Sequence, residues 1–268
     1  MNITGILAAT LAVSLVGIFV GLFLGIAGIK FKVETDEREE AIVNALPGNN
    51  CGGCGYAGCS GLAAAIVKGE AAVNACPVGG EPVGQKIAEI MGVEAGSSVR
   101  MTAFVHCQGD CDKAAIDYAY TGVEDCRVMA FVPGGGPKSC QSGCLGYGSC
   151  VKVCPFGAIR VENGVAVVDR EACKACGKCV AVCPKQLISL IPYAAKTEVA
   201  CRSKDKGPVT MKACQVGCIG CGICVKNCPS QAIAVHDLHA EIDQEKCTGC
   251  GACREKCPKK AIVSVGGK

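Results

Sequence analysis

The sequence predicts an α+β protein in which an apolar N-terminal helix precedes a small cysteine-rich domain and two copies of a larger cysteine-rich unit. Three observations predict this organisation. From Met1 to Ile29 no side chain is charged, and a glycine-rich stretch with four cysteines follows between Cys51 and Cys76. Beyond it, seven cysteines recur at one fixed offset, that from Cys144 to Cys218. A match at one offset indicates a duplicated structural unit. The expected boundaries are residues 1–29 for the helix, 30–97 for the small domain, 98–139 for a cysteine-containing connecting segment, 140–195 for the first repeated unit and 196–268 for the second.

The N-terminal segment is long and apolar enough to cross a membrane. As a helix, Ile3 to Ile29 reaches about 40 Å, whereas the hydrocarbon layer of a bilayer is about 30 Å thick. A cleaved signal peptide would have a basic start and a shorter apolar run. We therefore expect one retained transmembrane helix in the cell membrane. Lys30 and Lys32 follow it at once, so the positive-inside rule places the bulk of the chain on the cytoplasmic side.

The small domain carries a cysteine pattern that predicts a metal site of its own. The spacing is C-x2-C-x4-C-x16-C, and the last cysteine precedes Pro77. The interleaved glycines let the backbone pack closely against a cluster, and zinc is the alternative metal. Helices are expected over residues 34–46, 61–69 and 81–91. The predicted ligands of one four-iron cluster are Cys51, Cys54, Cys59 and Cys76.

The repeated units contain the cysteine spacing of bacterial two-cluster ferredoxins. In the run C-x2-C-x2-C-x3-C-P, three closely spaced thiolates bind one iron–sulfur cube and the fourth binds the neighbouring cube. Zinc sites usually keep two ligand pairs roughly 12 or more residues apart. The complete runs therefore predict three four-iron clusters. Their ligands are Cys173, Cys176 and Cys179 with Cys154, then Cys218, Cys221 and Cys224 with Cys257, and finally Cys247, Cys250 and Cys253 with Cys228.

One run of the first unit lacks its middle cysteine, because Tyr147 stands where Cys221 stands in the second unit. Cys140 is the expected substitute, since thiolate is the ligand that these clusters select. A three-iron cluster with an empty corner is the alternative. Cys140 also has a counterpart, Cys214, in the unit where nothing is missing. The expected ligand set of this fifth cluster is Cys140, Cys144, Cys150 and Cys183.

Five cysteines lie outside these five clusters. A sixth iron–sulfur site built from some of them is one hypothesis, and free buried thiols are the other. A strand is expected over residues 99–105, and hairpins are expected after Ala158, with a turn at Asn163-Gly164, and over residues 233–242. No histidine is assigned as a ligand. The possible ligands of the further site are Cys107, Cys111, Cys126, Cys201 and Cys214.

The composition fits a cluster-binding protein of a reducing compartment. The 268 residues include 25 cysteines, 36 glycines, no tryptophan and 4% aromatic residues, too little bulky apolar material for an ordinary large core. Metal clusters must therefore contribute to folding. The spacings are those of clusters rather than of disulfides. The formal charge of +3 becomes roughly −7 with five oxidised clusters, and nothing in it indicates nucleic-acid binding.

The sequence contains no Ser/His/Asp arrangement, phosphate-binding loop or dinucleotide fingerprint, and we assign no catalytic residue. Four-iron clusters accept and pass single electrons. The residues alone thus predict a membrane-anchored electron-transfer protein with at least five clusters.

Several motifs together resemble the B subunit of the Rnf complex. They are the N-terminal helix, the motif Asn-Cys-Gly-Gly-Cys-Gly-Tyr-Ala-Gly-Cys at residues 50–59, the run of residues 143–156 and the doubled ferredoxin units. The resemblance covers essentially the whole chain. Within the family, the chain most resembles the long form of the subunit, which carries more clusters than the short form. It implies a membrane complex that oxidises reduced ferredoxin, reduces NAD and moves sodium ions or protons. It also implies that this chain receives the electrons, and that the site at Cys51 to Cys76 passes them to the membrane subunits.

Two other functions are compatible with the same residues. One is a polyferredoxin serving another membrane redox enzyme, such as a hydrogenase, whose complex would lack NAD-reducing activity. The other is a structural zinc-binding adaptor, which would be colourless because zinc has no absorption band near 400 nm.

Overall fold

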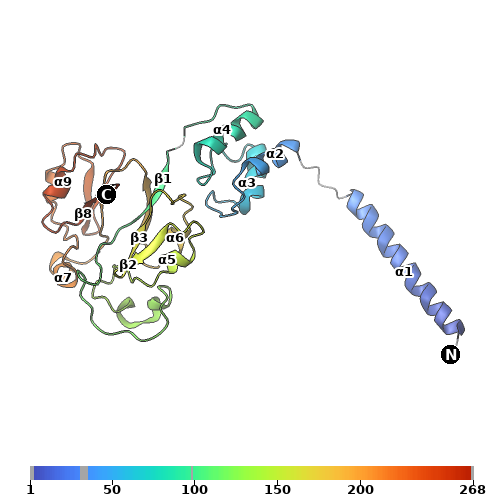
Figure 1. The fold of residues 1–268 in the computed structure, drawn as a ribbon, viewed down its shortest axis with the longest axis horizontal. Helices are drawn as coiled ribbons and strands as arrows, with labels where there is room; N and C mark the ends of the chain where they lie inside the picture. The colour runs from blue at the N-terminus through green and yellow to red at the C-terminus, as the bar shows by residue number, and fades with distance from the viewer. Residues whose placement is uncertain (1–2, 31–35, 98, 267–268) are drawn as a thin grey trace.

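The computed structural model describes residues 3–30, 36–97 and 99–266. The first element is the helix α1 (Ile3–Lys30), which extends away from the rest of the chain in Figure 1. The large apolar side chains described on it are exposed, with exposed fractions from 46% at Val20 to 73% at Val13. Within the described residues, Leu11–Gly28 is the one stretch of helix long and apolar enough to be a candidate membrane span. The predicted N-terminal helix is confirmed.

The small domain that follows is a bundle of three short helices. They are α2 (Glu37–Ala45), α3 (Gly58–Val67) and α4 (Gly80–Met91). Asp36 caps α2 by accepting a 2.9 Å hydrogen bond from the backbone N–H of Arg38. The apolar faces of the three helices meet in one small core of Ile42, Leu62 and Ile87, all at most 1% exposed. The three helices expected from the sequence are confirmed, except that residues 34 and 35 of the first expected helix lie outside the described residues.

The first repeated unit consists of two antiparallel strand pairs joined by short helices. The hairpin of β2 (Ile159–Glu162) and β3 (Val165–Val168) turns at Asn163 and Gly164, whose φ angles of 45° and 76° lie in the left-handed region that such turns require. The other pair joins β1 (Met101–Val105) to β4 (Ile188–Pro192), with Val105 opposite Ile188. The unit contains β1 (Met101–Val105), the 3-10 helices η1 (Val128–Phe131) and η2 (Pro133–Gly135), α5 (Ser149–Lys152), β2 (Ile159–Glu162), β3 (Val165–Val168), α6 (Lys178–Val182) and β4 (Ile188–Pro192).

The second unit repeats this plan. Its hairpin is formed by β6 (Ile233–His236) and β7 (His239–Ile242). Its second pair joins β5 (Thr197–Val199) to β8 (Ile262–Ser264), with Val199 opposite Ile262. Val199 thus takes the place that Val105 has in the first unit. β1 lies in the segment expected to be a connection, yet it completes the sheet of the first unit. The second unit contains β5 (Thr197–Val199), α7 (Gly207–Ala213), α8 (Ile223–Lys226), β6 (Ile233–His236), β7 (His239–Ile242), α9 (Ala252–Glu255) and β8 (Ile262–Ser264).

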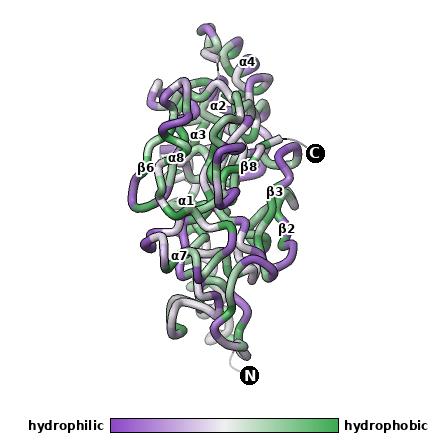
Figure 2. The backbone as a smooth tube through the Cα atoms, turned by 90° about the vertical axis from the view of Figure 1, so that its left-hand side faces the viewer, coloured by the Kyte–Doolittle hydropathy of each residue, from purple (hydrophilic) through white to green (hydrophobic). Residues whose placement is uncertain are grey.

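The core of each repeated unit is made of thiols and small aliphatic side chains. In the first unit Ala103, Ile159 and Ile188 pack with Cys150 and Cys179, and the second unit has an equivalent cluster. Figure 2 shows hydrophobic (green) and hydrophilic (purple) stretches interleaved along the tube. The small domain and the two units follow one another away from α1 in Figure 1.

Candidate iron–sulfur centres

Short helices place one cysteine of each run inside its unit. Cys150, Cys179, Cys224 and Cys253 are buried on α5, α6, α8 and α9, respectively. A glycine with φ between 70° and 78° precedes each of these helices, and L-residues rarely adopt this conformation. A glycine at this position lets the chain turn directly into the helix that carries the buried cysteine. These glycines are Gly148, Gly177, Gly222 and Gly251.

The structure brings together the cysteines that the three complete runs were expected to combine. All 25 cysteines lie in the described part of the chain, and none forms a disulfide. Burial raises the pKa of Cys253, and the nearby Cys247, Cys228 and Cys250 add to that rise. One cavity is lined by Cys154, Cys173, Cys176 and Cys179, which we call the Cys154 set. A second cavity is lined by Cys218, Cys221, Cys224 and Cys257, the Cys257 set. The third group consists of Cys228, Cys247, Cys250 and Cys253, the Cys228 set.

The four cysteines of the small domain also lie close together, and we call them the Cys76 set (Cys51, Cys54, Cys59 and Cys76). Burial raises the pKa of Cys76, and Cys51 and Cys54 contribute to the rise. The Cys76 sulfur accepts a 3.3 Å hydrogen bond from the backbone N–H of Gly79. Asn50 holds the loop by accepting a 2.8 Å bond from the N–H of Cys59.

Cys140 does not join the three cysteines with which its place in the sequence groups it. The cavity lined by Cys144, Cys150 and Cys183 has Cys126 as its fourth thiol, and Cys140 lines a different cavity. Burial raises the pKa of Cys150 to about 12, and Cys144, Cys126 and Cys183 are the thiols that add to this rise. The geometry thus places Cys126, and not Cys140, in the same cavity as Cys144, Cys150 and Cys183; we call these four cysteines the Cys126 set.

A local hydrogen-bond network explains why Cys126 takes this place. The backbone N–H of Cys126 donates to the Ser149 hydroxyl at 2.9 Å, and that hydroxyl donates to the Asp125 carboxylate at 3.0 Å. Hydrogen bonds from Arg127 hold the pKa of Asp125 below its usual value, so the carboxylate remains a strong acceptor. Ser149 begins α5, and the network therefore ties Cys126 to the helix that carries Cys150.

Cys140 lines a cavity between the two repeated units, together with Cys107, Cys201 and Cys214. We call these four cysteines the inter-unit set. Cys107 and Cys201 face each other across an isolated antiparallel bridge. The first follows β1 and the second follows β5, the two equivalent strands. Each unit thus contributes two thiols to one cavity.

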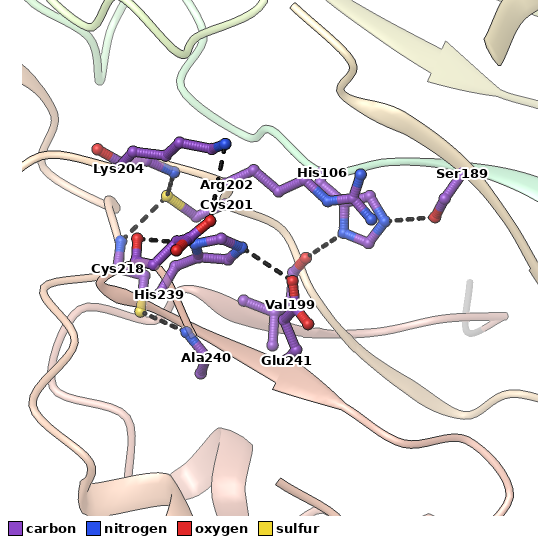
Figure 3. Close-up of polar contacts among 12 residues, drawn as sticks. His106, Ser189, Val199, Cys201, Arg202, Lys204, Cys218, His239, Ala240 and Glu241 are labelled. Carbon is purple, nitrogen blue, oxygen red and sulfur yellow. Dashed lines mark hydrogen bonds and ion pairs between the residues drawn. The ribbon is translucent and has the colours of Figure 1, made fainter. Parts of the chain in front are cut away.

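Equivalent hydrogen bonds connect the inter-unit set to both units. The Cys144 N–H donates to the Cys107 sulfur at 3.4 Å, and the Cys218 N–H donates to the Cys201 sulfur at 3.2 Å. Figure 3 shows the second of these contacts, with the Cys218 sulfur accepting in turn from the N–H of Ala240 at 3.5 Å. The cavity therefore lies against a ligand candidate of each unit.

Burial of the inter-unit thiols disfavours bare thiolates, so neutral thiols and metal-bound thiolates are the two states that fit this cavity. Burial raises the pKa of Cys140 to about 11 and that of Cys201 to about 12. Bare thiolates would be poorly solvated here, whereas iron supplies compensating positive charge. Gly109 leaves room, because a Cβ there would lie 3.1 Å from the Cys214 sulfur. In the described residues the acidic, histidine and cysteine side chains form no group of three that could hold a single ion; the thiols are spread around cavities.

Neighbouring sets are in contact along the chain of domains. A Cβ on Gly53 would lie 2.8 Å from the carbonyl oxygen of Cys176, so the loop of the Cys76 set packs directly on that of the Cys154 set. Cys173 and Cys179 share one core cluster with Cys150. In the second unit, Cys218 and Cys253 likewise share a core cluster. Together with the inter-unit contacts, the six sets form one continuous row.

The remaining chemistry-bearing residues lie outside these sets. Cys111 is exposed beside Gly164 and is not among the lining residues of the thiol cavities above. Burial lowers the pKa of His106 to about 4, so its neutral ring donates to the Val199 carbonyl at 2.8 Å and accepts from the Ser189 hydroxyl at 2.6 Å. His106 thereby links β4 to β5, as Figure 3 shows. His239 contacts Glu241 at 3.2 Å.

Comparison with known proteins identifies three cysteine-rich domains. A family model for an Fe-S cluster matches residues 46–78, and two 4Fe-4S dicluster domain models match residues 137–184 and 217–261. These matches cover the cysteines of the small domain and the runs of both units.

Similar proteins match over most of the chain. The B subunit of the Na(+)-translocating ferredoxin:NAD(+) oxidoreductase complex of Acetobacterium woodii is 47% identical over 86% of this chain and 69% of its own length. The B subunit of an ion-translocating oxidoreductase complex of Methanosarcina acetivorans is 45% identical, over 83% of this chain and 84% of its own length. The B subunit of the proton-translocating ferredoxin:NAD(+) oxidoreductase complex of Clostridium ljungdahlii is 43% identical, over 86% and 82%, respectively.

Proposed function

The chain belongs to the family of B subunits of ion-translocating ferredoxin:NAD oxidoreductase (Rnf) complexes, and we propose that it takes electrons from reduced ferredoxin and passes them to membrane subunits of such a complex. It is an iron–sulfur electron-transfer subunit, with one iron–sulfur domain and two 4Fe-4S dicluster domains. The donor, the direction of transfer and the ligand of each iron are the parts that we propose.

The continuous row of thiol sets is the observation that carries this proposal. Four-iron clusters supply one-electron transfer when they are bound. We propose six of them, held by the Cys76, Cys154, Cys126, inter-unit, Cys257 and Cys228 sets in that spatial order. Of the cysteines, only Cys111 is left outside this assignment. The sixth cluster, in the inter-unit set, joins the two dicluster units.

The two ends of the row differ in what they face. The Cys76 set belongs to the domain that follows α1, so we propose that this end delivers electrons to subunits in the membrane, with the bulk of the chain on the cytoplasmic side. At the other end Cys250 is exposed, and so are Arg254 and Lys256, with one exposed carboxylate, that of Glu255, between them in the sequence. An exposed ligand with cationic neighbours suits docking of an acidic electron carrier, and we propose that ferredoxin binds there.

Membranes from cells that lack this chain test the function. Ferredoxin-dependent NAD reduction is expected to be lost, to return with the full chain, and to remain absent with a Cys250→Ser chain that is present in the membrane at the same level. The control is Cys111→Ser, which is expected to restore activity fully. Membranes that keep ferredoxin-dependent NAD reduction without the chain would instead support the alternative of a polyferredoxin for another redox enzyme.

A further inference from the structure

Lys138 is a buried cation between two of the thiol sets, and we propose that its ammonium raises the reduction potentials of the clusters held by the inter-unit set and the Cys126 set. The inference rests on the cluster assignments made above. Lys138 is only 6% exposed. Lysine is almost never fully buried unless it is paired, because an ammonium is costly to desolvate.

The ammonium of Lys138 is held by two backbone carbonyls rather than by an acid. It donates to the oxygen of Gly109 at 2.8 Å and to that of Gly164 at 2.9 Å. Among the described residues no carboxylate forms an ion pair with it. Two carbonyls fix its position but do not neutralise its charge, so the ammonium is available to stabilise negative charge nearby.

The first carbonyl connects Lys138 to the inter-unit set. Lys138 lines the same cavity as these four cysteines. Gly109, whose carbonyl it binds, lies against the sulfurs of Cys214 and Cys107, since a Cβ there would meet them at 3.1 and 3.8 Å. Gly109 thus lies between the ammonium and two of the four thiols.

The second carbonyl connects Lys138 to the Cys126 set. The oxygen of Gly164 lies against Gly146, where a Cβ would approach it to 2.7 Å, and Gly146 lines the cavity of that set. One ammonium is therefore held by a carbonyl beside each of the two neighbouring sites.

Other cations near these cavities are less deeply buried than Lys138. Arg202 lines the inter-unit cavity, is half-buried, and donates to the Gln186 carbonyl at 3.0 Å. Lys185 lines the cavity of the Cys126 set, is also half-buried, and interacts electrostatically with Cys140 and Cys183, one thiol of each set. Lys138 differs from both in being buried and in being fixed by a carbonyl beside each set.

Reduction of a four-iron cluster adds one negative charge, and a fixed cation in a medium of low dielectric constant stabilises that charge. Lys138 should therefore make the two central clusters easier to reduce than their thiolate ligands alone would allow. This would favour passage of an electron from the second unit to the first.

The test is a redox titration, followed by EPR spectroscopy, of the full-length protein and its Lys138→Met variant. With iron content unchanged, two clusters of the variant are expected to become about tenfold harder to reduce, which corresponds to about 59 mV for a one-electron couple. Lys138→Arg, which keeps the charge, is expected to titrate like the parent. Lys86→Met is the matched control, because Lys86 is an exposed lysine on α4.

Unchanged potentials in Lys138→Met with full iron content would overturn the inference. Lys138→Gln keeps hydrogen-bond donors without the charge and covers the case in which Met disturbs folding. If Met and Gln variants both lose clusters while the Arg variant keeps the parent's clusters but shifts their potentials, the lysine is a structural residue and the inference is wrong. A parent protein with too little iron for the inter-unit cluster would instead count against the cluster assignment itself.

Discussion

Replacing Cys201 by serine is expected to remove one four-iron cluster and to disconnect the two dicluster units. Burial raises the pKa of the Cys201 thiol to about 12, and this residue lies between Cys107 and the backbone of Cys218. Loss of one ligand leaves three thiols from two units around the inter-unit cavity. The expected result is a loss of about four iron atoms from about 24 per chain, measured on anaerobically purified protein. Electron transfer from the second unit to the first should fall with it.

Two variants make this prediction specific. Cys214→Ser should lose the same cluster, and the Cys201→Ser/Cys214→Ser double variant should lose no more iron than either single variant. Cys111→Ser is the matched control, since Cys111 is exposed and should leave the iron content unchanged. Full iron content in Cys201→Ser and Cys214→Ser would contradict the inter-unit assignment.

Replacing Cys126 and Cys140 by serine, singly and together, is expected to remove different clusters. Cys126 lines the cavity of Cys144 and Cys150, whereas Cys140 lines the inter-unit cavity. Each single variant should therefore lose about four iron atoms, or about one if a three-iron cluster remains, and the double variant should show both losses.

Pairing these variants with Cys201→Ser separates the two possible groupings. The Cys140→Ser/Cys201→Ser protein should lose one cluster, because both residues belong to one set. The Cys126→Ser/Cys201→Ser protein should lose two. If Cys126→Ser kept all of its iron while Cys140→Ser/Cys201→Ser lost two clusters, the grouping expected from the sequence would be restored.

Local spacing in the sequence was enough to group the cysteines of the complete runs. Cys173, Cys176 and Cys179 lie within one loop, and the proline after the fourth cysteine marks the partner run. The strands and the hairpin at Asn163-Gly164 could likewise be predicted, because their turn chemistry and alternation are local signals.

The inter-unit set could not be assembled in this way, since its thiols come from four separate segments. The equivalence of Cys107 and Cys201 is visible only in the strand pairing. β1 pairs with β4 and β5 pairs with β8, and this places Val105 and Val199 in equivalent positions of the two units. A signal was present in the sequence: each cysteine follows such a valine by two residues. The first unit has a longer segment after Cys107 than the second has after Cys201. The two cysteines are therefore not separated by the offset that relates Cys144 to Cys218, and the comparison at that offset does not align them.

The cavity that Cys140 lines could not be predicted for a related reason. Its nearness to Cys144 in the sequence made it the obvious substitute for the ligand lost at Tyr147. Sequence distance could not reveal that Ser149 holds the more distant Cys126 against α5 through a 2.9 Å hydrogen bond. The pairing of Cys140 with Cys214 as counterparts was the better guide, because both line the cavity between the units.

The proposed electron path depends on 24 of the 25 cysteines binding iron–sulfur clusters in one continuous row. Metal and acid-labile sulfide analysis of the anaerobically isolated full-length protein tests this assignment directly. The expected result is about 24 iron and about 24 sulfide per chain, with broad absorption near 400 nm and no stoichiometric zinc. A content of about 20 iron atoms per chain would contradict the cluster proposed between the units. Zinc in place of iron, or no metal at all, would contradict the whole assignment.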